Sequence, residues 1–288
     1  MANIIMGFPN LADKCVLSGG SWQASLPITN LQDRRISKKA RSTNATTAST
    51  QFQFTLDKER IVNLIGVIGH NLTTSAQFRL KGNTSASFAS PLYDSGWKDV
   101  WVDMADGIYG GLEWESDSFW TWKMDAEEAA YYPGLAFESI DNIVTYRYWQ
   151  IEFSDTGNPA GYVEIGRLFV GNSFQPESNV SFGWSLAYED NSVIESAIGG
   201  AEYYDNRPKY RVARFGLNWL SDLEAMTTAL GASRILGVTD EILIIWDKDD
   251  GNNLMRQSFL GRLRTLSPID NPDPIRFTTS YEIKEIIA

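Results

Sequence analysis

The sequence predicts a mainly β protein, and three observations support that prediction. Aromatic residues make up 12% of the 288 residues, with ten tryptophans among them, and aromatic side chains favour strands. Apolar and polar residues alternate at 50–56, 76–81 and 146–153, which is typical of strands with one buried and one solvated face. Only one stretch, 221–230, has the pattern of a capped helix.

Two segments about eighty residues apart predict a β-sandwich. In each of them, 50–72 and 146–171, an alternating strand leads into a second strand that ends in Gly or Asn. We interpret the two segments as opposite walls of one sandwich. This pattern favours a binding or structural module over a catalyst.

The elements of the first region follow in order. Residues 1–45 are rich in turn formers, and strands are expected at 50–56, 61–69 and 76–81. Residues 91–135 carry five tryptophans among many acidic residues and show little periodicity. We interpret them as a Trp-rich insertion between two sandwich strands, since long excursions in compact domains are usually functional or mobile. Strands resume at 146–153 and 162–170.

A polar stretch at 171–179, where Pro, Ser, Asn and Gly cluster, predicts a domain boundary. The first domain is therefore expected at 1–173 and the second at 178–288. For the second domain the sequence predicts a β-sandwich or β-barrel with one helix. Its strands are expected at 181–188, 210–219, 241–246, 255–264 and 275–283, with a loop at 199–208 and a hairpin turn at 247–253.

The helix of the second domain has its own start and stop signals. Ser221 is a good N-cap, Glu224 completes a capping box, and Gly231 is a natural C′ residue. One apolar face is expected, made of Leu220, Leu223, Met226, Thr227 and Leu230.

The charge, the cysteine content and the lack of long apolar runs argue against several kinds of protein. The net charge of −11 and pI of about 4.7 argue against direct nucleic-acid binding, which needs a basic surface. Cys15 is the only cysteine, so no intrachain disulfide can form. Residues 1–9 lack a basic start and a long apolar core, and no apolar run reaches membrane-spanning length. We expect synthesis in a cytoplasm and no membrane span.

Few residues are candidates for a catalytic or metal-binding role. His70 is the only histidine, and we expect it to bond backbone at a strand end and Cys15 to be a buried thiol, over the alternative of a Cys15/His70 pair. Glu113 and Glu115 lie near tryptophans and are a candidate carboxylate pair of a glycan hydrolase, but we favour a solvated strand edge. The acidic turn 247–253 lacks the closing Glu of a calcium loop. We expect no enzymatic activity, no cofactor and no metal.

The tryptophans of the insertion are the candidate ligand-binding residues. Trp97, Trp101 and Trp114 present flat aromatic faces of the kind that suit glycan or protein partners. The alternative, which we favour, is that they pin the insertion onto the sandwich.

Several pieces of the first region resemble the discoidin or galactose-binding-like jelly roll, in the version found in tail proteins of long-tailed bacteriophages. They include Leu26-Pro-Ile-Thr-Asn-Leu31, Gly66-Val-Ile-Gly-His-Asn-Leu72, Arg147-Tyr-Trp-Gln-Ile151 and Glu164-Ile-Gly-Arg-Leu-Phe-Val-Gly171. In element order, and in the hairpin ending Phe259-Leu-Gly-Arg-Leu263, residues 178–288 resemble the modules of phage tail-tube and distal tail proteins. Two features depart from that family, since its ring module usually comes first and its jelly roll lacks the Trp-rich insertion.

The resemblance implies a non-enzymatic structural component of a phage tail, near the distal end, tail tip or baseplate. It would form a homo-oligomeric ring through 178–288, contact other tail proteins, and reside in the virion tail after synthesis in the host cytoplasm. The alternative is a carbohydrate-binding adhesin subunit that recognises a host surface glycan.

Overall fold

A computed structural model describes residues 3–103, 119 and 122–287 of the chain. The chain divides into two compact units. The first takes in the chain up to Gln175 together with Leu243–Phe259, and the second takes in Pro176–Ile242 with Leu260–Ile287. The return of 243–259 to the first unit has no counterpart in the sequence prediction, which divided the chain once.

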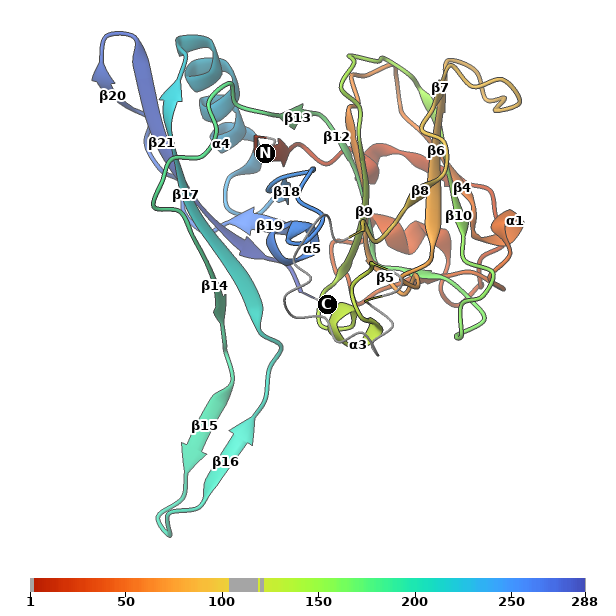
Figure 1. Cartoon of the computed structure of the whole chain (residues 1–288), viewed down its shortest axis with the longest axis horizontal. Helices are drawn as coiled ribbons and strands as arrows, with labels where there is room; N and C mark the ends of the chain where they lie inside the picture. The colour runs from red at the N-terminus through yellow and green to blue at the C-terminus, as the bar shows by residue number, and fades with distance from the viewer. Residues whose placement is uncertain (1–2, 104–118, 120–121, 288) are drawn as a thin grey trace. The chain divides into compact units, whose positions relative to one another are not determined.

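The first unit is built mainly of strands, with a few short helical turns (Figure 1). The strands are β1 (Ile5–Gly7), β2 (Val16–Ser18), β3 (Ala40–Arg41), β4 (Phe52–Thr55), β5 (Leu64–His70), β6 (Gln77–Asn83), β7 (Tyr93–Asp94), β8 (Lys98–Asp99), β9 (Gly134–Ser139), β10 (Tyr148–Ser154), β11 (Glu164–Ile165), β12 (Arg167–Gly171), β13 (Ser173–Phe174) and the greater part of β18 (Glu241–Ile245). The helical pieces are η1 (Ala12–Lys14), η2 (Ile28–Gln32), α1 (Thr47–Thr50), α3 (Ala126–Ala129) and α5 (Leu254–Gln257).

Two antiparallel sheets form the sandwich of the first unit. One has the order β2-β4-β10-β6-β7, with β8 also paired to β6, and the other has the order β12-β5-β9. Ile151 of β10 lies between Phe52 of β4 and Leu80 of β6 in register. Because sequence-distant strands pair in both sheets, this is the interleaved strand order of a jelly roll.

The two predicted segments are not opposite walls. Each contributes one strand to each sheet: β4 and β10 pair in one sheet, whereas β5 and β12 pair in the other. The interpretation that each segment forms one wall of the sandwich was therefore wrong. Alternation shows which face of a strand is buried, but it carries no information about which strand lies beside it.

The sandwich core is aromatic on the side of the larger sheet. Phe54 and Trp149 stack with their rings 6.2 Å apart and 8° from parallel, and both are fully buried. The intervening side chains Gln53 and Tyr148 are less buried, as the alternation predicts. Such aromatic pairs contribute about 0.5–1.5 kcal/mol beyond the area they bury.

Strand β5 is buried along its whole length, on both faces. Its outer face is covered by the paired strands β13, β1 and β18 of the eight-stranded sheet, and Leu243 of β18 packs so close to Gly66 that a Cβ there would lie 2.9 Å from the leucine. This contact links residues 243–259 to the first unit, because Leu243 covers a part of β5 that would otherwise be solvated.

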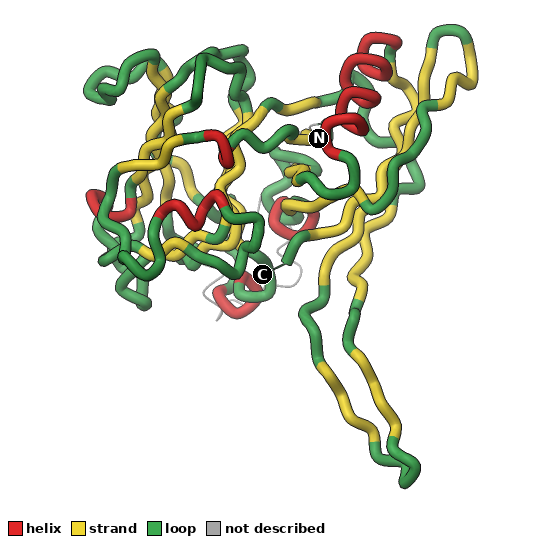
Figure 2. Tube along the Cα trace, turned by 180° about the vertical axis from the view of Figure 1, so that it is seen from behind, coloured by secondary structure: helices red, strands yellow, loops and turns green. Residues whose placement is uncertain are grey.

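The second unit contains one helical segment and strands of one open sheet, plus a separate hairpin, among its described residues (Figure 2). Its elements are β14 (Ser185–Glu189), β15 (Val193–Ser196), β16 (Glu202–Asp205), β17 (Tyr210–Leu220), η3 (Glu224–Ala229), α4 (Leu230–Leu236), β19 (Phe259–Leu263), β20 (Asp270–Asp273) and β21 (Arg276–Glu285). Its strands occupy the β19-β21-β17-β14 part of the eight-stranded sheet, with β20 also beside β21. Where the sequence predicted a sandwich or barrel, the second layer is supplied by the helix. The predicted strand at 255–264 begins only at Phe259, because α5 occupies residues 254–257.

A buried ion pair ties the two longest strands of this sheet. Arg211 of β17 and Glu285 of β21 are almost fully buried, and the Nε of Arg211 donates to the Glu285 carboxylate over 2.9 Å. The backbone N–H of Arg211 donates to the same carboxylate over 2.8 Å. Bonds to both guanidinium and backbone offset the cost of removing the two charges from water.

The helix begins as predicted but ends later. Ser221 and Glu224 form the capping box, with the Glu224 carboxylate accepting from the Ser221 N–H at 2.9 Å. The helix continues through Gly231 and ends at Leu236, where Gly237 takes a φ of 51°. The prediction of Gly231 as C′ was wrong, because the glycine has open space around it and the helical pattern continues beyond it.

The buried face of the helix also differs from the prediction. Its buried residues are Ala225, Ala229, Ala232 and Leu236. Leu223, Met226 and Leu230, which the sequence pattern assigned to the core, are exposed, Leu223 by 73%. Small alanines let the helix approach the sheet closely, and the larger apolar side chains then point to solvent.

Candidate functional site

The three candidate tryptophans have different surroundings. Trp97 lies in the connection between β7 and β8, just after Gly96, whose φ of +66° allows the tight turn there. The Trp97 side chain is 41% exposed. An exposed indole at a strand edge is free to stack on a ligand.

Trp101 is buried, with only 4% of its surface exposed. Its indole N–H donates to the backbone oxygen of Leu72 over 3.2 Å, and its ring meets His70 edge-on. These contacts give Trp101 the pinning role that was the alternative to ligand binding. Trp114 lies outside the described residues, as do Glu113 and Glu115 of the hydrolase hypothesis.

His70 bonds a backbone group and Cys15 is a buried thiol, as the sequence predicted. The Nδ1 of His70 accepts from the Leu72 N–H at 3.3 Å, and burial lowers the pKa of the imidazole to about 3. The Cys15 thiol donates to the Leu11 oxygen over 3.4 Å, and burial raises its pKa to about 12. At neutral pH both groups are therefore uncharged and unsuited to nucleophile–base chemistry.

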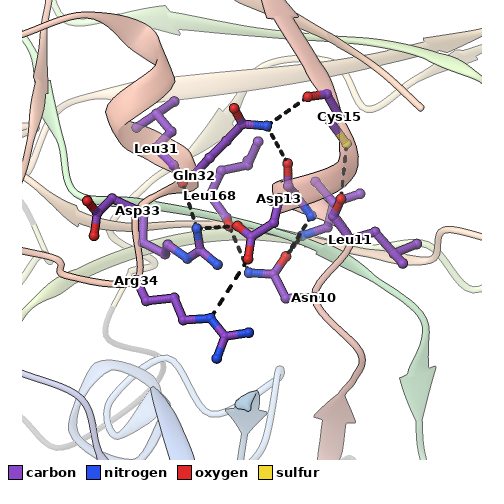
Figure 3. Close-up of polar contacts among 12 residues, drawn as sticks. Asn10, Leu11, Asp13, Cys15, Leu31, Gln32, Asp33, Arg34 and Leu168 are labelled. Carbon is purple, nitrogen blue, oxygen red and sulfur yellow. Dashed lines mark hydrogen bonds and ion pairs between the residues drawn. The ribbon is translucent and has the colours of Figure 1, made fainter. Parts of the chain in front are cut away.

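A dense polar cluster surrounds Cys15 and looks at first like a site (Figure 3). Gln32 donates to the backbone oxygens of Ala12 and Cys15 over 2.8 and 2.7 Å. Asp13 accepts from the fully buried Arg167 at 2.7 Å. All of these bonds join the N-terminal segment to η2 and β12, so the cluster fastens the start of the chain to the sandwich.

A pocket of about 520 Å³ lies within the first unit, beside the β8–β9 edge of the sandwich and the segment that returns after β18. Buried apolar side chains on its walls include Phe78, Val100 and Leu254. The sequence prediction missed this pocket, since two parts of its wall, near residues 98–103 and 248–254, are far apart in the chain.

Charged pairs line the same pocket. Lys98 of β8 donates to both oxygens of Glu138 on β9, over 2.7 and 2.8 Å. The Tyr93 hydroxyl donates to Glu138 as well, over 2.7 Å, which together with burial raises the pKa of that phenol. Lys248 lies 3.0 Å from Asp141. The described lining has five carboxylates and two lysines, and is therefore acidic.

The acidic turn after β18 leads into a helix. Asp250 accepts from the N–H and the side-chain amide of Asn253 at 3.2 and 2.8 Å, and α5 begins at Leu254. The predicted turn at 247–253 is thus followed by a helical turn before β19 begins. Within the part of the chain that the structure describes, no group of three or more His, Cys, Asp or Glu residues could hold a metal ion.

The second unit has two exposed apolar surfaces. The hairpin β15–β16, here called the arm, is exposed at every strand residue and extends from the sheet as a two-stranded ribbon (Figure 1). Its exposed large apolar side chains include Ile194, Ile198 and Tyr203. The helix contributes Leu223, Met226 and Leu230, here called the helix face. The sequence prediction placed 199–208, which include β16, in a loop, and expected the residues of the helix face to share one apolar side of the helix.

No protein-family model matches the chain, and no curated protein matches it. The chain is similar to solved structures of carbohydrate-binding modules. One is CBM32-1 from a family 31 glycoside hydrolase of Clostridium perfringens, with 9% identity, a TM-score of 0.36, and coverage of 57% of this chain and 99% of that one. Another is the family 32 module of C. perfringens NanJ in complex with galactose, with 11% identity, a TM-score of 0.37, and coverage of 58% and 99%. A third is a His 62 mutant of the lectin binding domain of Lectinolysin complexed with Lewis b, with 13% identity, a TM-score of 0.36, and coverage of 57% and 96%.

At these identities and TM-scores, the similarity says nothing about what this chain binds. The predicted fold class, mainly β with a jelly-roll sandwich in the first part, is confirmed by the sheets of the first unit. None of the helices among the described residues is long and apolar enough to cross a membrane.

Proposed function

We propose that this chain is a non-enzymatic structural component of a protein assembly, and that the second unit joins it to further copies of itself. The observation that carries the proposal is the arm. All eight residues of β15 and β16 are exposed, and valine, isoleucine and tyrosine are among them. Exposed apolar surface of this extent marks interaction sites, and an isolated two-stranded hairpin is at best marginally stable in water.

The helix face supplies a second surface on the same unit. Leu223, Met226 and Leu230 recur at helical spacing, so they present one apolar stripe. The arm and the helix face are different surfaces. Contact of one surface with the other on a neighbouring copy is heterologous, and such contacts generate rings when the rotation closes.

The resemblance of the sequence favours a bacteriophage tail as the setting of this assembly, near the distal end or baseplate. The ring would then be made by the second unit, with the jelly-roll unit facing neighbouring tail proteins. The proposed location is the virion tail after synthesis in the host cytoplasm.

Substitution of the arm tests the proposal. Ile194→Asp with Ile198→Asp places charges on two exposed apolar positions of the arm, and should lower the sedimentation mass of the full chain to that of a monomer while leaving its circular dichroism unchanged. Ile143→Asp is the matched control, because Ile143 is 77% exposed, between Ile194 at 61% and Ile198 at 110%, but lies in the first unit. An oligomer that survives the double substitution in the arm, or that Ile143→Asp dissolves, would overturn the proposal.

A second function, recognition of a carbohydrate by the jelly-roll unit, is favoured by the exposed indole of Trp97. Aromatic faces bind the apolar face of a sugar ring. Trp97→Ala should weaken glycan binding by the folded full chain, whereas an exposed tyrosine elsewhere in the unit, in Tyr131→Ala, should have no effect. Unchanged glycan binding in Trp97→Ala would remove Trp97 from this role.

A further inference from the structure

We propose that the pocket at the β8–β9 edge of the first unit binds a saccharide that carries no acidic group. This inference rests on the proposed carbohydrate recognition and gives it a site separate from the indole of Trp97, which is not part of the pocket wall. The volume of about 520 Å³ is in the range of pockets that hold small molecules.

The pocket offers an apolar surface for the C–H face of a sugar ring. Phe78, Val100 and Leu254 are almost fully buried where they line it, so their positions are set by the core behind them. Phe137 of β9 adds a second aromatic ring to the wall. A ligand with one apolar face gains by displacing water from this surface.

Two lysine–carboxylate pairs supply the polar contacts. Glu138 is 4% exposed and is held in place by Lys98 and by the Tyr93 hydroxyl. Lys248 and Asp141 form a second and more exposed pair. Each pair sets a donor beside an acceptor, and neighbouring hydroxyls of a sugar need that combination because every hydroxyl both donates and accepts.

The charge of the wall selects against acidic sugars. Asp99, Asp103 and Asp249 add three carboxylates to those of the two pairs, and the cations against these five are Lys98, Lys248 and Lys123, which lies 3.2 Å from Asp99. An anionic ligand would be repelled by this excess and by the chain's net charge of −11. Neutral hydroxyls, in contrast, donate well to carboxylates.

Binding of a sugar panel to the full chain tests the site. The probes are galactose, glucose, N-acetylglucosamine and N-acetylneuraminic acid, measured by ligand-observed NMR and titration calorimetry. Val102 lines the pocket but is partly exposed, so Val102→Trp fills the space without disturbing the core. Asp141→Asn with Lys248→Met removes one polar pair. The matched control is Asp57→Asn with Arg60→Met, which removes another surface pair of the same unit.

The expected result is binding of at least one neutral sugar by the wild type, abolished by Val102→Trp and weakened about tenfold by the loss of the Lys248–Asp141 pair. The control pair should bind as the wild type does. Binding that survives Val102→Trp would overturn the pocket and leave carbohydrate recognition standing at another site. Preference for N-acetylneuraminic acid would overturn the charge argument. Binding of no sugar at all would overturn this inference together with the recognition function.

Discussion

The indole of Trp101 stands edge-on to the imidazole of His70, with ring centroids 6.2 Å apart and planes at 87°. Both rings also bond Leu72: the indole N–H donates to its oxygen, and its N–H donates to the imidazole. The backbone of Leu72 thus holds the side chains of Trp101 and His70 in place. The contact fastens the chain after β8 to the end of β5.

Removal of the Trp101 ring should destabilise the first unit. Trp101→Ala leaves a large cavity and should cost about 3–5 kcal/mol in the free energy of unfolding. Trp97→Ala, at an exposed position, should change it by about 0.5 kcal/mol or less. Urea denaturation followed by tryptophan fluorescence measures both, and equal losses would contradict the different roles assigned to the two residues.

The sequence could not separate these two tryptophans. Both lie in an aperiodic stretch and are four positions apart, so alternation and helical spacing alike would place them on the same face. Burial of Trp101 depends on His70 and Leu72, which are about thirty residues away in the chain. Local pattern predicts strands, whereas the choice between a core and a surface indole depends on tertiary contacts.

Protonation of His70 should destabilise the fold in mild acid. Burial lowers its pKa in the folded chain from 6.5 to about 3, so between these values the unfolded chain binds a proton that the folded chain does not. The free energy of unfolding is therefore highest above pH 6.5 and falls as the pH drops toward 3. From pH 7 to pH 5 the loss due to His70 should be about 2 kcal/mol.

Urea denaturation at the two pH values, with wild type and His70→Gln, isolates this contribution. Glutamine keeps an acceptor for the Leu72 N–H but cannot titrate. The pH-dependent loss should be about 2 kcal/mol smaller in the variant. The same loss in both proteins would show that His70 is not the group responsible.

The buried pair in the second unit should be costly to break. Glu285→Gln removes the charge of a carboxylate that is bonded to the buried Arg211 guanidinium and should cost about 3–5 kcal/mol. Asp273→Asn, which alters an exposed pair with Arg276 in the same unit, should cost about 0.5 kcal/mol or less. Thermal and urea unfolding of the two variants should therefore differ clearly, and a mild effect of Glu285→Gln would show that water reaches the pair.

The two glycines of the helix should respond in opposite directions. Gly231→Ala fills open space inside the helix and should stabilise the chain by about 0.5–1 kcal/mol. Gly237→Ala forces a side chain onto a φ of 51° and ψ of −141°, and should destabilise it by about 1–3 kcal/mol. Stability changes of the same sign would place the helix end at Gly231, as the sequence alone suggested.

Strands with alternating patterns were predictable. β4, β6, β10, β17 and β21 lie where the alternation indicates them. Strand β9 and the arm were missed, because β9 begins at the end of the Trp-rich insertion and lies mostly in the unassigned stretch after it, and the arm has no buried face to produce a pattern. The pocket was missed for a third reason: its walls come from parts of the chain that meet only because Leu243–Phe259 returns to the first unit.

The mass of the purified full chain in solution, by light scattering over a range of concentrations, tests the central claim of self-association most directly. A defined oligomer larger than a dimer, seen as closed rings in negative-stain images, is the predicted result. A monomer of 32.3 kDa at every concentration would contradict it.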